Sequence, residues 1–227
     1  MRLVILLAGI LPSSVFKNKI LRMLGFDIHI SADIQPCLII NVGHISAGPS
    51  SRIGALTCIR GIRRLILEDS ARIGQLNWIS AAPDLTMETK SGILQIGAHS
   101  AITNRHYLDC SGGINLGSHT TVAGVRSTFI THGINWKRSE QSVSSIEIGS
   151  YCIISSNVNV TPGTRLPDNS VVGMGVTIDK GLSKEGGLVV SHRGVLVKGD
   201  LVGDYFTRTS GVVKPPADAD AIGSSHQ

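Results

Sequence analysis

One stretch in the second half of this chain carries an aliphatic residue at every sixth position, and few folds tolerate that period. The positions are Ile148, Ile154, Val160, Leu166, Val172 and Ile178. A helix repeats every 3.6 residues and a strand every two, so neither element alone explains a period of six. A short strand followed by a sharp bend does explain it, because each repeat then returns an aliphatic side chain to the same core.

The same spacing occurs upstream in sets of three. The sets are Leu67, Ile73 and Ile79, then Ile96, Ile102 and Leu108, then Leu116, Val122 and Thr128, with a looser version at Ile28, Ile34 and Ile40 and at Ile53 and Ile59. Three six-residue repeats make one 18-residue triangular coil, and the longer gaps fall after the third repeat. The pattern therefore predicts an all-β, left-handed parallel β-helix, with two longer segments (about 80–95 and 129–147) projecting from one edge. The hexapeptide signature is our reason for accepting a handedness that parallel strands otherwise avoid.

The composition agrees with a β-rich fold that has an aliphatic core. Apolar residues make up 42% of the 227 residues, aromatic residues only 4% and charged residues only 16%, with 26 glycines. These values exclude a disordered chain, a helical bundle and a collagen-like chain. The net charge of +5 favours an anionic partner, such as a phosphorylated cofactor or a membrane surface. The sequence contains no Lys/Arg-rich helix and no aromatic stacking motif of the kind that binds nucleic acid.

The sequence divides into an N-terminal segment (1–25), a β-helix (26–182), a C-terminal extension (183–210) and a polar tail (211–227) that is typical of disorder. The apolar run from Leu3 to Leu11 is too short to span a bilayer. After it, Ser13 or Ser14 is positioned to cap a short amphipathic helix that runs to Leu24 and ends at Gly25.

Lys17, Lys19 and Arg22 would form a basic face on this helix. Two roles fit it: it lies on a membrane surface, or it caps the open end of the β-helix.

Two further sets of residues are informative, one for the fold and one for the compartment. Ser70, His99, His119 and Tyr151 each lie three positions after an aliphatic repeat residue, which predicts that they form part of a ladder on one face of the stack. The four cysteines form no CxxC pair and sit in apolar runs, as free buried thiols do in a reducing compartment such as the cytoplasm. They are Cys37, Cys58, Cys110 and Cys152.

Three segments resemble a known family. They are LPSSVFKNKILRMLGFDI, LDCSGGINLGSHTTV and IEIGSYCIISSNVNVTPGTRLPDNSVVGMGVTI. Together they are similar to the hexapeptide-repeat acyltransferases, in particular the maltose and galactoside acetyltransferases and the O-acetyltransferases of polysaccharide gene clusters. The resemblance implies acyl transfer from acetyl-CoA to a hydroxyl or amine, in clefts between the subunits of a homotrimer, and no metal.

The resemblance also suggests which residues act. His132, in the segment FITHGINW, matches the family's general base, which would take the proton of a sugar hydroxyl as it attacks the thioester. Many relatives carry a second histidine two positions later, where this chain has Ile134. Asn135 and Trp136 are candidate acceptor contacts, with Trp136 as a stacking surface for the sugar. Asn104 lies within one residue of an asparagine position in the galactoside-type relatives.

By the same resemblance, Ser156, Met174 and Lys180 fall on positions that line the acyl-CoA groove. Lys198 lies near a basic position that follows the coils. The family's strand after the coils is replaced here by VVSHRGVLV, in which Arg193 could contact a phosphate. The resulting expectation is O-acetylation of a sugar in cell-surface polysaccharide biosynthesis, in the cytoplasm or at the inner face of the membrane.

Two other functions remain open. Some left-handed β-helix trimers are zinc-dependent carbonic anhydrases, but the spacing of His99, His106, His119 and His132 does not match their ligand pattern. A non-catalytic scaffold would explain the missing second histidine and the altered segment after the coils.

Overall fold

The computed structural model describes residues 2–89, 91–135, 137, 139–181 and 185–191. Trp136, Arg193, Lys198 and the predicted polar tail lie outside the described residues, as does most of the predicted extension 183–210.

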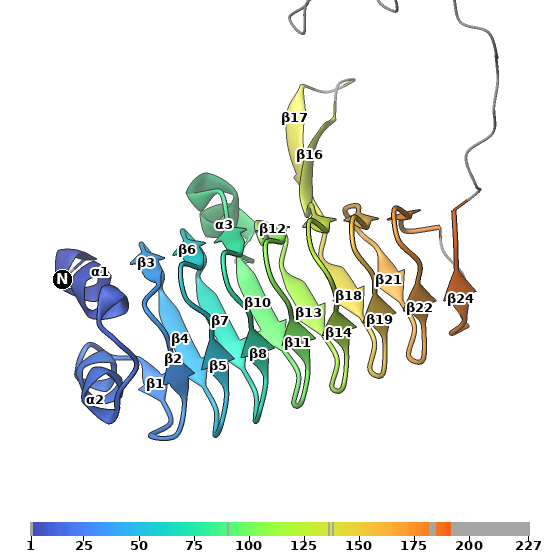
Figure 1. Ribbon diagram of the computed structural model, residues 1–227. Coiled ribbons are helices and arrows are strands. Elements are labelled where there is room, and N and C mark those ends of the chain that lie inside the picture. Colours follow the sequence, from blue (N-terminus) through green and yellow to red (C-terminus); the bar gives the residue numbers. More distant parts are fainter. Residues whose placement is uncertain (1, 90, 136, 138, 182–184, 192–227) are drawn as a thin grey trace, which may run out of the picture. The chain divides into compact units, whose positions relative to one another are not determined.

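Short strands build three parallel sheets that share one core (Figure 1). Sheet A contains β1 (Asp27–Ile28), β4 (His44–Ala47), β7 (Arg64–Leu67), β10 (Ile93–Ile96), β13 (Ile114–Leu116), β18 (Ile146–Ile148) and β21 (Arg165–Leu166). Sheet B contains β2 (Asp33–Ile34), β5 (Arg52–Ile53), β8 (Arg72–Ile73), β11 (Ala101–Ile102), β14 (Thr121–Val122), β19 (Ile153–Ile154), β22 (Val171–Val172) and β24 (Leu188–Val189). Sheet C contains β3 (Leu38–Ile40), β6 (Cys58–Arg60), β9 (Trp78–Ser80), β12 (Tyr107–Asp109), β15 (Thr128–Phe129), β20 (Asn159–Val160) and β23 (Thr177–Ile178).

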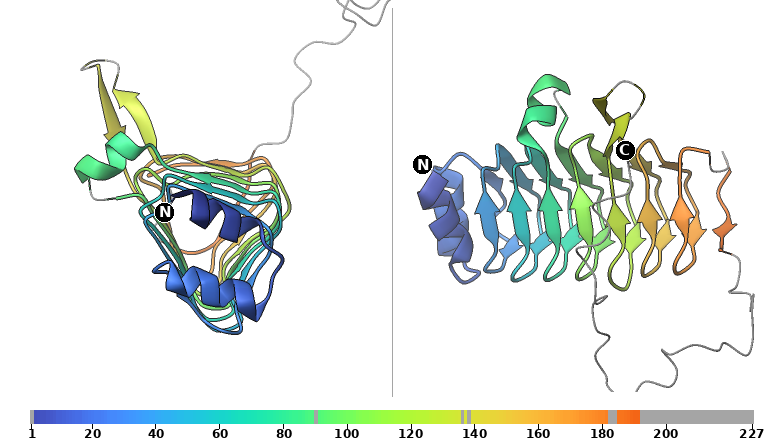
Figure 2. Two further views of the ribbon diagram at one scale, coloured as in Figure 1. Left: turned by 90° about the vertical axis from the view of Figure 1, so that its left-hand side faces the viewer. Right: turned by 90° about the horizontal axis from the view of Figure 1, so that it is seen from above.

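The chain visits sheets A, B and C in turn, so each circuit is one coil of a parallel β-helix. Seen along the stack, the coils superpose on a rounded triangle with three corners, A–B, B–C and C–A (Figure 2). In sheet B the inward residues Ile53, Ile73, Ile102, Val122 and Ile154 are paired from coil to coil and are at most 1% exposed. Burying an aliphatic side chain of this size stabilises the folded state by about 1.5–3 kcal/mol. Each coil of the stack adds such a side chain in sheet B.

Coil length differs along the stack, and two predicted core positions are wrong. Ile148 pairs with Leu166, 18 residues later, but Ile59 pairs with Ile79, 20 residues later. The extra residues lie at the C–A corner in the early coils, where the turn is longer. The inward residues are Ile39 (1% exposed) and Phe129 (0%), where the period of six had placed Ile40 and Thr128.

Two longer segments leave the stack at the C–A corner, as predicted. One contains α3 (Pro83–Thr89) and connects β9 to β10. The other is a hairpin of β16 (His132–Asn135) and β17 (Glu140–Val143), antiparallel to each other, which connects β15 to β18. Both project from the same edge (Figures 1 and 2). The coil register resumes after each of them, because Leu67 pairs with Ile96 and Leu116 pairs with Ile148.

Two helices cover the first coil. Ser14 caps α2 (Val15–Met23) by accepting a hydrogen bond from the Lys17 backbone N–H, and Gly25 follows with a φ of 93°, which confirms the predicted helix. The preceding apolar run forms a second helix, α1 (Arg2–Ile10), which the sequence analysis did not predict. Ile5 and Leu21 are buried, and the helices lie across the end of the stack (Figure 2). The capping role proposed for α2 is confirmed.

Lys17 does not belong to a basic surface. It is 0% exposed, and its Nζ donates to the carbonyl oxygens of Gly9 at 2.7 Å, Leu11 at 2.9 Å and Gln35 at 3.0 Å. These bonds tie the end of α1 to α2 and to the first coil. Only Lys19 and Arg22 of the three basic residues remain exposed on α2.

The predicted ladder forms at the A–B corner. The rings of His99 and His119 stack with centroids 5.1 Å apart, and those of His119 and Tyr151 with centroids 4.8 Å apart. Ser70 shares their left-handed backbone conformation, with φ between 56° and 59° for all four residues. The four cysteines are free and buried, as predicted.

Candidate active site

The hairpin positions His132 at its own base. His132 is the first residue of β16 and pairs with Val143, the last residue of β17. The base of the hairpin stays beside the coil stack, where the chain leaves the C–A corner, while the rest of the hairpin extends away (Figure 1). The side chain is 38% exposed, so a substrate can reach it.

An aspartate from the preceding coil faces this histidine. Asp109 ends β12, and its Oδ2 lies 2.7 Å from Nδ1 of His132. The two residues are 23 positions apart in sequence, but one turn of the coil brings them together. The Asp109 side chain is only 4% exposed, so the pair joins a buried carboxylate to a partly exposed imidazole.

Four other donors hold the Asp109 carboxylate. Oδ1 accepts from the Ser111 hydroxyl at 2.6 Å and from the Ser111 backbone N–H at 3.2 Å, and Oδ2 accepts from the Thr131 backbone N–H at 2.9 Å and from the Thr131 hydroxyl at 2.8 Å. The carboxylate is therefore held by residues of two successive coils at this corner. It also fastens the base of the hairpin, because Thr131 precedes His132.

These contacts decide the charge of Asp109. Burial by itself would raise the pKa of this carboxyl, but the hydrogen bonds from Ser111, His132 and Thr131 outweigh it and lower the pKa below its ordinary value. Asp109 is then ionised at neutral pH and accepts the proton on Nδ1 of His132. In the neutral ring, a proton on Nδ1 leaves Nε2 as the acceptor, which is the form a general base requires.

A second histidine near this region has a different character. His106 is 2% exposed, its Nδ1 accepts from the Ser127 backbone N–H at 3.1 Å, and its Nε2 lies 3.0 Å from the Thr103 hydroxyl. Burial lowers its pKa to about 4, so the ring is neutral at physiological pH. Both ring nitrogens are occupied inside the B–C corner, and His106 serves the fold.

The two candidate acceptor residues that the structure describes, Asn135 and Asn104, do not gather around His132 within one chain. Asn135 lies three positions further along β16, and side chains an odd number of residues apart point to opposite faces of a strand. Asn104 lies at the B–C corner, where its Oδ1 accepts from the Gln75 backbone N–H at 2.6 Å. Each residue already has a local role in the chain.

The candidate acyl-CoA residues divide between two corners. Met174, 72% exposed, and Ser156, whose hydroxyl accepts from the Val125 backbone N–H at 3.2 Å, lie at the B–C corner. Lys180 is exposed and follows β23 at the C–A corner, two strand spacings or about 10 Å from the level of β15. The six residues from Met174 to Lys180 cross sheet C, a span of roughly 20 Å. Of the three candidates within the described residues, Lys180 alone lies at the corner that carries His132.

Two exposed aromatic side chains lie on the outer face of sheet C, beside the dyad. Trp78 is 43% exposed and Tyr107 is 44% exposed, and they are paired in register on β9 and β12. Tyr107 is two residues before Asp109, so both side chains leave the same face of the strand. An apolar surface suited to a sugar ring therefore lies on the same strand face as Asp109.

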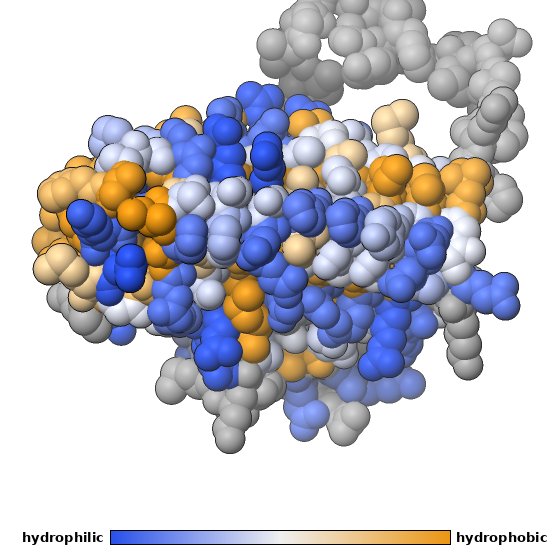
Figure 3. Space-filling model, turned by 90° about the horizontal axis from the view of Figure 1, so that it is seen from below, coloured by the Kyte–Doolittle hydropathy of each residue, from blue (hydrophilic) through white to orange (hydrophobic). Residues whose placement is uncertain are grey.

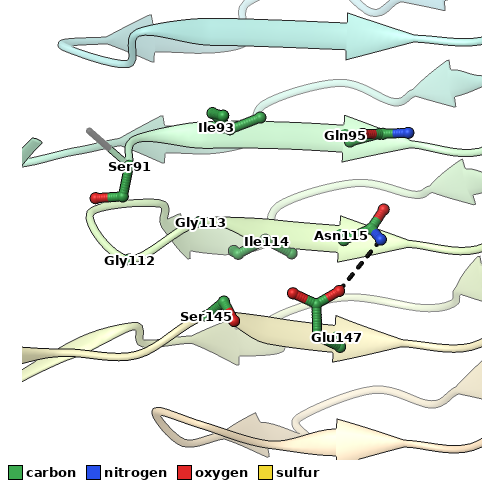
Figure 4. A pocket seen from close by; sticks show the side chains of 9 residues that line it. All are labelled: Ser91, Ile93, Gln95, Gly112, Gly113, Ile114, Asn115, Ser145 and Glu147. Atoms are coloured by element: carbon green, nitrogen blue, oxygen red, sulfur yellow. Dashed lines mark hydrogen bonds between the residues drawn. The ribbon is translucent and has the colours of Figure 1, made fainter. Parts of the chain in front are cut away.

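A hollow of about 290 Å³ lies on the outer face of sheet A, at the base of the two projecting segments (Figure 4). Its lining consists of Ser91, Ile93, Gln95, Gly112, Gly113, Ile114, Asn115, Ser145 and Glu147. Asn115 donates to Glu147 at 3.2 Å across it. Gly112 connects the hollow to the dyad, because its N–H donates to the Thr131 hydroxyl at 2.8 Å.

The sequence analysis missed Asp109, although it lies in one of the quoted motifs. The signal that could have found it is the coil spacing: Leu108 pairs with Phe129, so the residues after Leu108 face those after Phe129. A carboxylate one coil before a loop histidine, next to the same corner, is a candidate partner for it.

No protein-family model matches this chain, and no curated protein matches it in sequence. Among the residues that the structure describes, no group of three or more His, Cys, Asp or Glu is placed to hold a metal ion.

Proposed function

We propose that this chain is a left-handed β-helix acyltransferase that transfers an acetyl group from acetyl-CoA to a sugar hydroxyl. The observation that carries the proposal is the contact of 2.7 Å between His132 Nδ1 and the buried carboxylate of Asp109. A partly exposed imidazole whose far nitrogen is unprotonated suits the activation of a weak nucleophile such as an alcohol. Asp109 acts as a positioning residue through His132.

In the proposed reaction, Nε2 of His132 takes the proton of the acceptor hydroxyl while the hydroxyl oxygen attacks the thioester carbonyl carbon. The tetrahedral intermediate then collapses with cleavage of the C–S bond, and the imidazolium returns the proton to the leaving thiolate. The products are the sugar ester and free CoA. The ionised Asp109 stabilises the imidazolium between the two steps.

The acceptor would lie against Tyr107 and Trp78, with Asn135, Trp136 and Asn104 as further candidate contacts. For the donor, the candidates are Ser156, Met174, Lys180, Arg193 and Lys198. Because Ser156 and Met174 lie at the corner away from His132, we propose that a neighbouring copy in a homotrimer supplies that side of the cleft. The four free, buried cysteines suit the reducing cytoplasm, where acetyl-CoA is available.

The test separates donor binding from catalysis. Thermal unfolding with and without millimolar acetyl-CoA should show the native state stabilised, by about 2.7 kcal/mol when the ligand is at 100 times its dissociation constant. His132→Ala should keep that shift and lose transfer to sugar acceptors, measured as release of the CoA thiol, by about 10²- to 10⁴-fold.

His29→Ala is the matched control, because His29 is an exposed histidine in the first coil, far from the hairpin. It should leave both readouts unchanged. Absence of any acetyl-CoA shift in the wild-type protein would favour the scaffold function instead. Unaltered transfer by His132→Ala would remove His132 from the mechanism.

A further inference from the structure

Helices α1 and α2 expose a large apolar surface on the side that faces away from the coils. We call this the end-cap face, and it includes the basic residues Arg2, Lys19 and Arg22, all exposed. Its large apolar side chains are between 48% and 87% exposed. They are Leu3, Val4, Leu7 and Ile10 of α1, and Val15, Phe16 and Met23 of α2. Figure 3 shows apolar and hydrophilic residues side by side at the end of the stack that carries these helices.

The fold does not require these exposed side chains. The opposite side of α1 already packs Ile5 and Ala8 against the first coil, and α2 packs Leu21 there. Residues 3, 7 and 10 recur at helical spacing, so they share one side of α1. A contiguous apolar surface of this kind on a folded protein marks an interaction site.

The charged residues of the two end helices are all basic. Residues 2–26 contain four basic residues and no Asp or Glu, and Lys17 is the only one of the four that is buried. The first acidic residue in the chain is Asp27, which is paired with His44 at 3.1 Å. Three exposed cations therefore border the apolar side chains of the end-cap face.

Exposed apolar side chains bordered by cations indicate which kind of partner would bind this face. A second copy packed on the same face by two-fold symmetry would bring Arg2, Lys19 and Arg22 of each copy together, and the one acid beside Arg22, Asp27, is already paired with His44. A bilayer with anionic headgroups accepts the apolar side chains and neutralises the cations at once. We propose that the end-cap face binds the surface of membranes that contain anionic lipids.

The binding would be interfacial. Each helix has nine residues and is about 14 Å long, and no helix in the described part of the chain is long and apolar enough to cross a bilayer. Because the helices lie across the end of the stack (Figure 2), the coils would stand away from the surface.

Asp109 and His132 would then lie roughly 25 Å above the membrane. That distance is three strand spacings of sheet C, from β3 to β12, plus one helix layer. A site at that height suits an acceptor carried on a membrane lipid. This last consequence depends on the proposed acyltransferase function, whereas the membrane docking does not.

The experiment is co-sedimentation of the full-length protein with vesicles of phosphatidylcholine alone or mixed with phosphatidylglycerol. Binding should require the anionic lipid and weaken as salt rises. The double variant Lys19→Glu/Arg22→Glu and the variant Phe16→Asp should each weaken it at least tenfold. Leu188→Asp is the matched control: Leu188 is 72% exposed but lies at the other end of the stack, and its substitution should leave binding unchanged.

A Phe16→Trp variant tests the orientation. Its added fluorescence should be quenched by brominated lipids, while that of Trp78, about 20 Å from the surface, should not. Equal binding to neutral vesicles, no effect of Phe16→Asp, or an oligomer in solution that Phe16→Asp dissociates would overturn the proposal. The acetyl-CoA unfolding shift is measured without vesicles, so failure of one proposal leaves the other standing.

Discussion

Lys17 and Asp109 are both buried charged side chains that fasten one part of the chain to another, but they use their hydrogen bonds differently. Lys17 donates its hydrogen bonds to three backbone carbonyl oxygens and contacts no titratable side chain through them. Asp109 shares its oxygens among Ser111, Thr131 and the ring of His132, which is 38% exposed. The charge of Lys17 stabilises only the fold, whereas the charge of Asp109 also acts on the accessible imidazole of His132.

Their pKa values lead to the same distinction. Burial lowers the pKa of Lys17, so its charged form is held at a cost. For Asp109 the hydrogen bonds outweigh burial and lower the pKa, so the charged form is favoured. A charge that the fold actively stabilises next to an exposed imidazole is the stronger candidate for chemistry.

The largest effect is expected for Asp109→Asn. The neutral amide has one acceptor oxygen in place of two and no charge, and its NH2 group must face one of the donors Ser111, Thr131 or His132. The proton on Nδ1 of His132 is therefore held less firmly, and the imidazolium loses its counter-charge. With the sugar acceptor, kcat should fall about 10²- to 10⁴-fold while the KM for acetyl-CoA stays within about twofold. Asp168→Asn is the control, since Asp168 also accepts a corner backbone N–H, from Ser150 at 2.7 Å. If kcat survives in Asp109→Asn, Asp109 resembles Lys17 and only supports the fold.

Lys17→Met should lower stability and leave chemistry alone. Three carbonyl oxygens lose their donor in a buried place, which should cost about 3 kcal/mol in the free energy of unfolding. Urea unfolding gives that value, and steady-state kinetics on the folded fraction should show an unchanged kcat. A specific loss of kcat in this variant would contradict the distinction between the two buried charges.

The pH dependence of stability should identify Asp109 as well. Because its pKa is lowered in the folded state, its contribution is fully present above the ordinary carboxyl pKa and is lost as the pH falls through the lower folded value. The difference in unfolding free energy between wild type and Asp109→Asn should therefore be constant near neutral pH and shrink below about pH 4. Urea titrations across that range measure it, and a difference that stays constant down to about pH 3 would oppose this assignment.

The smallest effect is expected for Thr131→Val. The substitution removes the hydroxyl that donates to Asp109 at 2.8 Å but keeps the backbone N–H that does the same. Stability should fall by about 1–2 kcal/mol and kcat by a few-fold. Thr120→Val is matched in burial and in hydroxyl bonding, since Thr120 donates to Gly149 and accepts from Cys152 at the A–B corner. It should show the loss of stability without the loss of kcat.

Much of the fold could be predicted from local sequence. The period of six predicted the coils, Ser14 predicted the start of α2, and the longer gaps predicted where segments leave the stack. The errors at Ile40 and Thr128 arose because a strict period ignores turns of other lengths at the B–C corner, where Ile34 and Ile39 are five residues apart and Val122 and Phe129 are seven. Lys17 was assigned to a basic surface because helical spacing does not reveal which face packs against the coils.

The sequence by itself determined which residues repeat, because strand alternation and turn preferences act over a few neighbouring positions. It also indicated His132 as a loop histidine. Only the tertiary structure decided that Asp109 is its partner and that Ser156 and Met174 lie at another corner. Contacts between coils depend on the summed length of every turn and insertion between them, so a change of one residue in a turn changes which side chains meet.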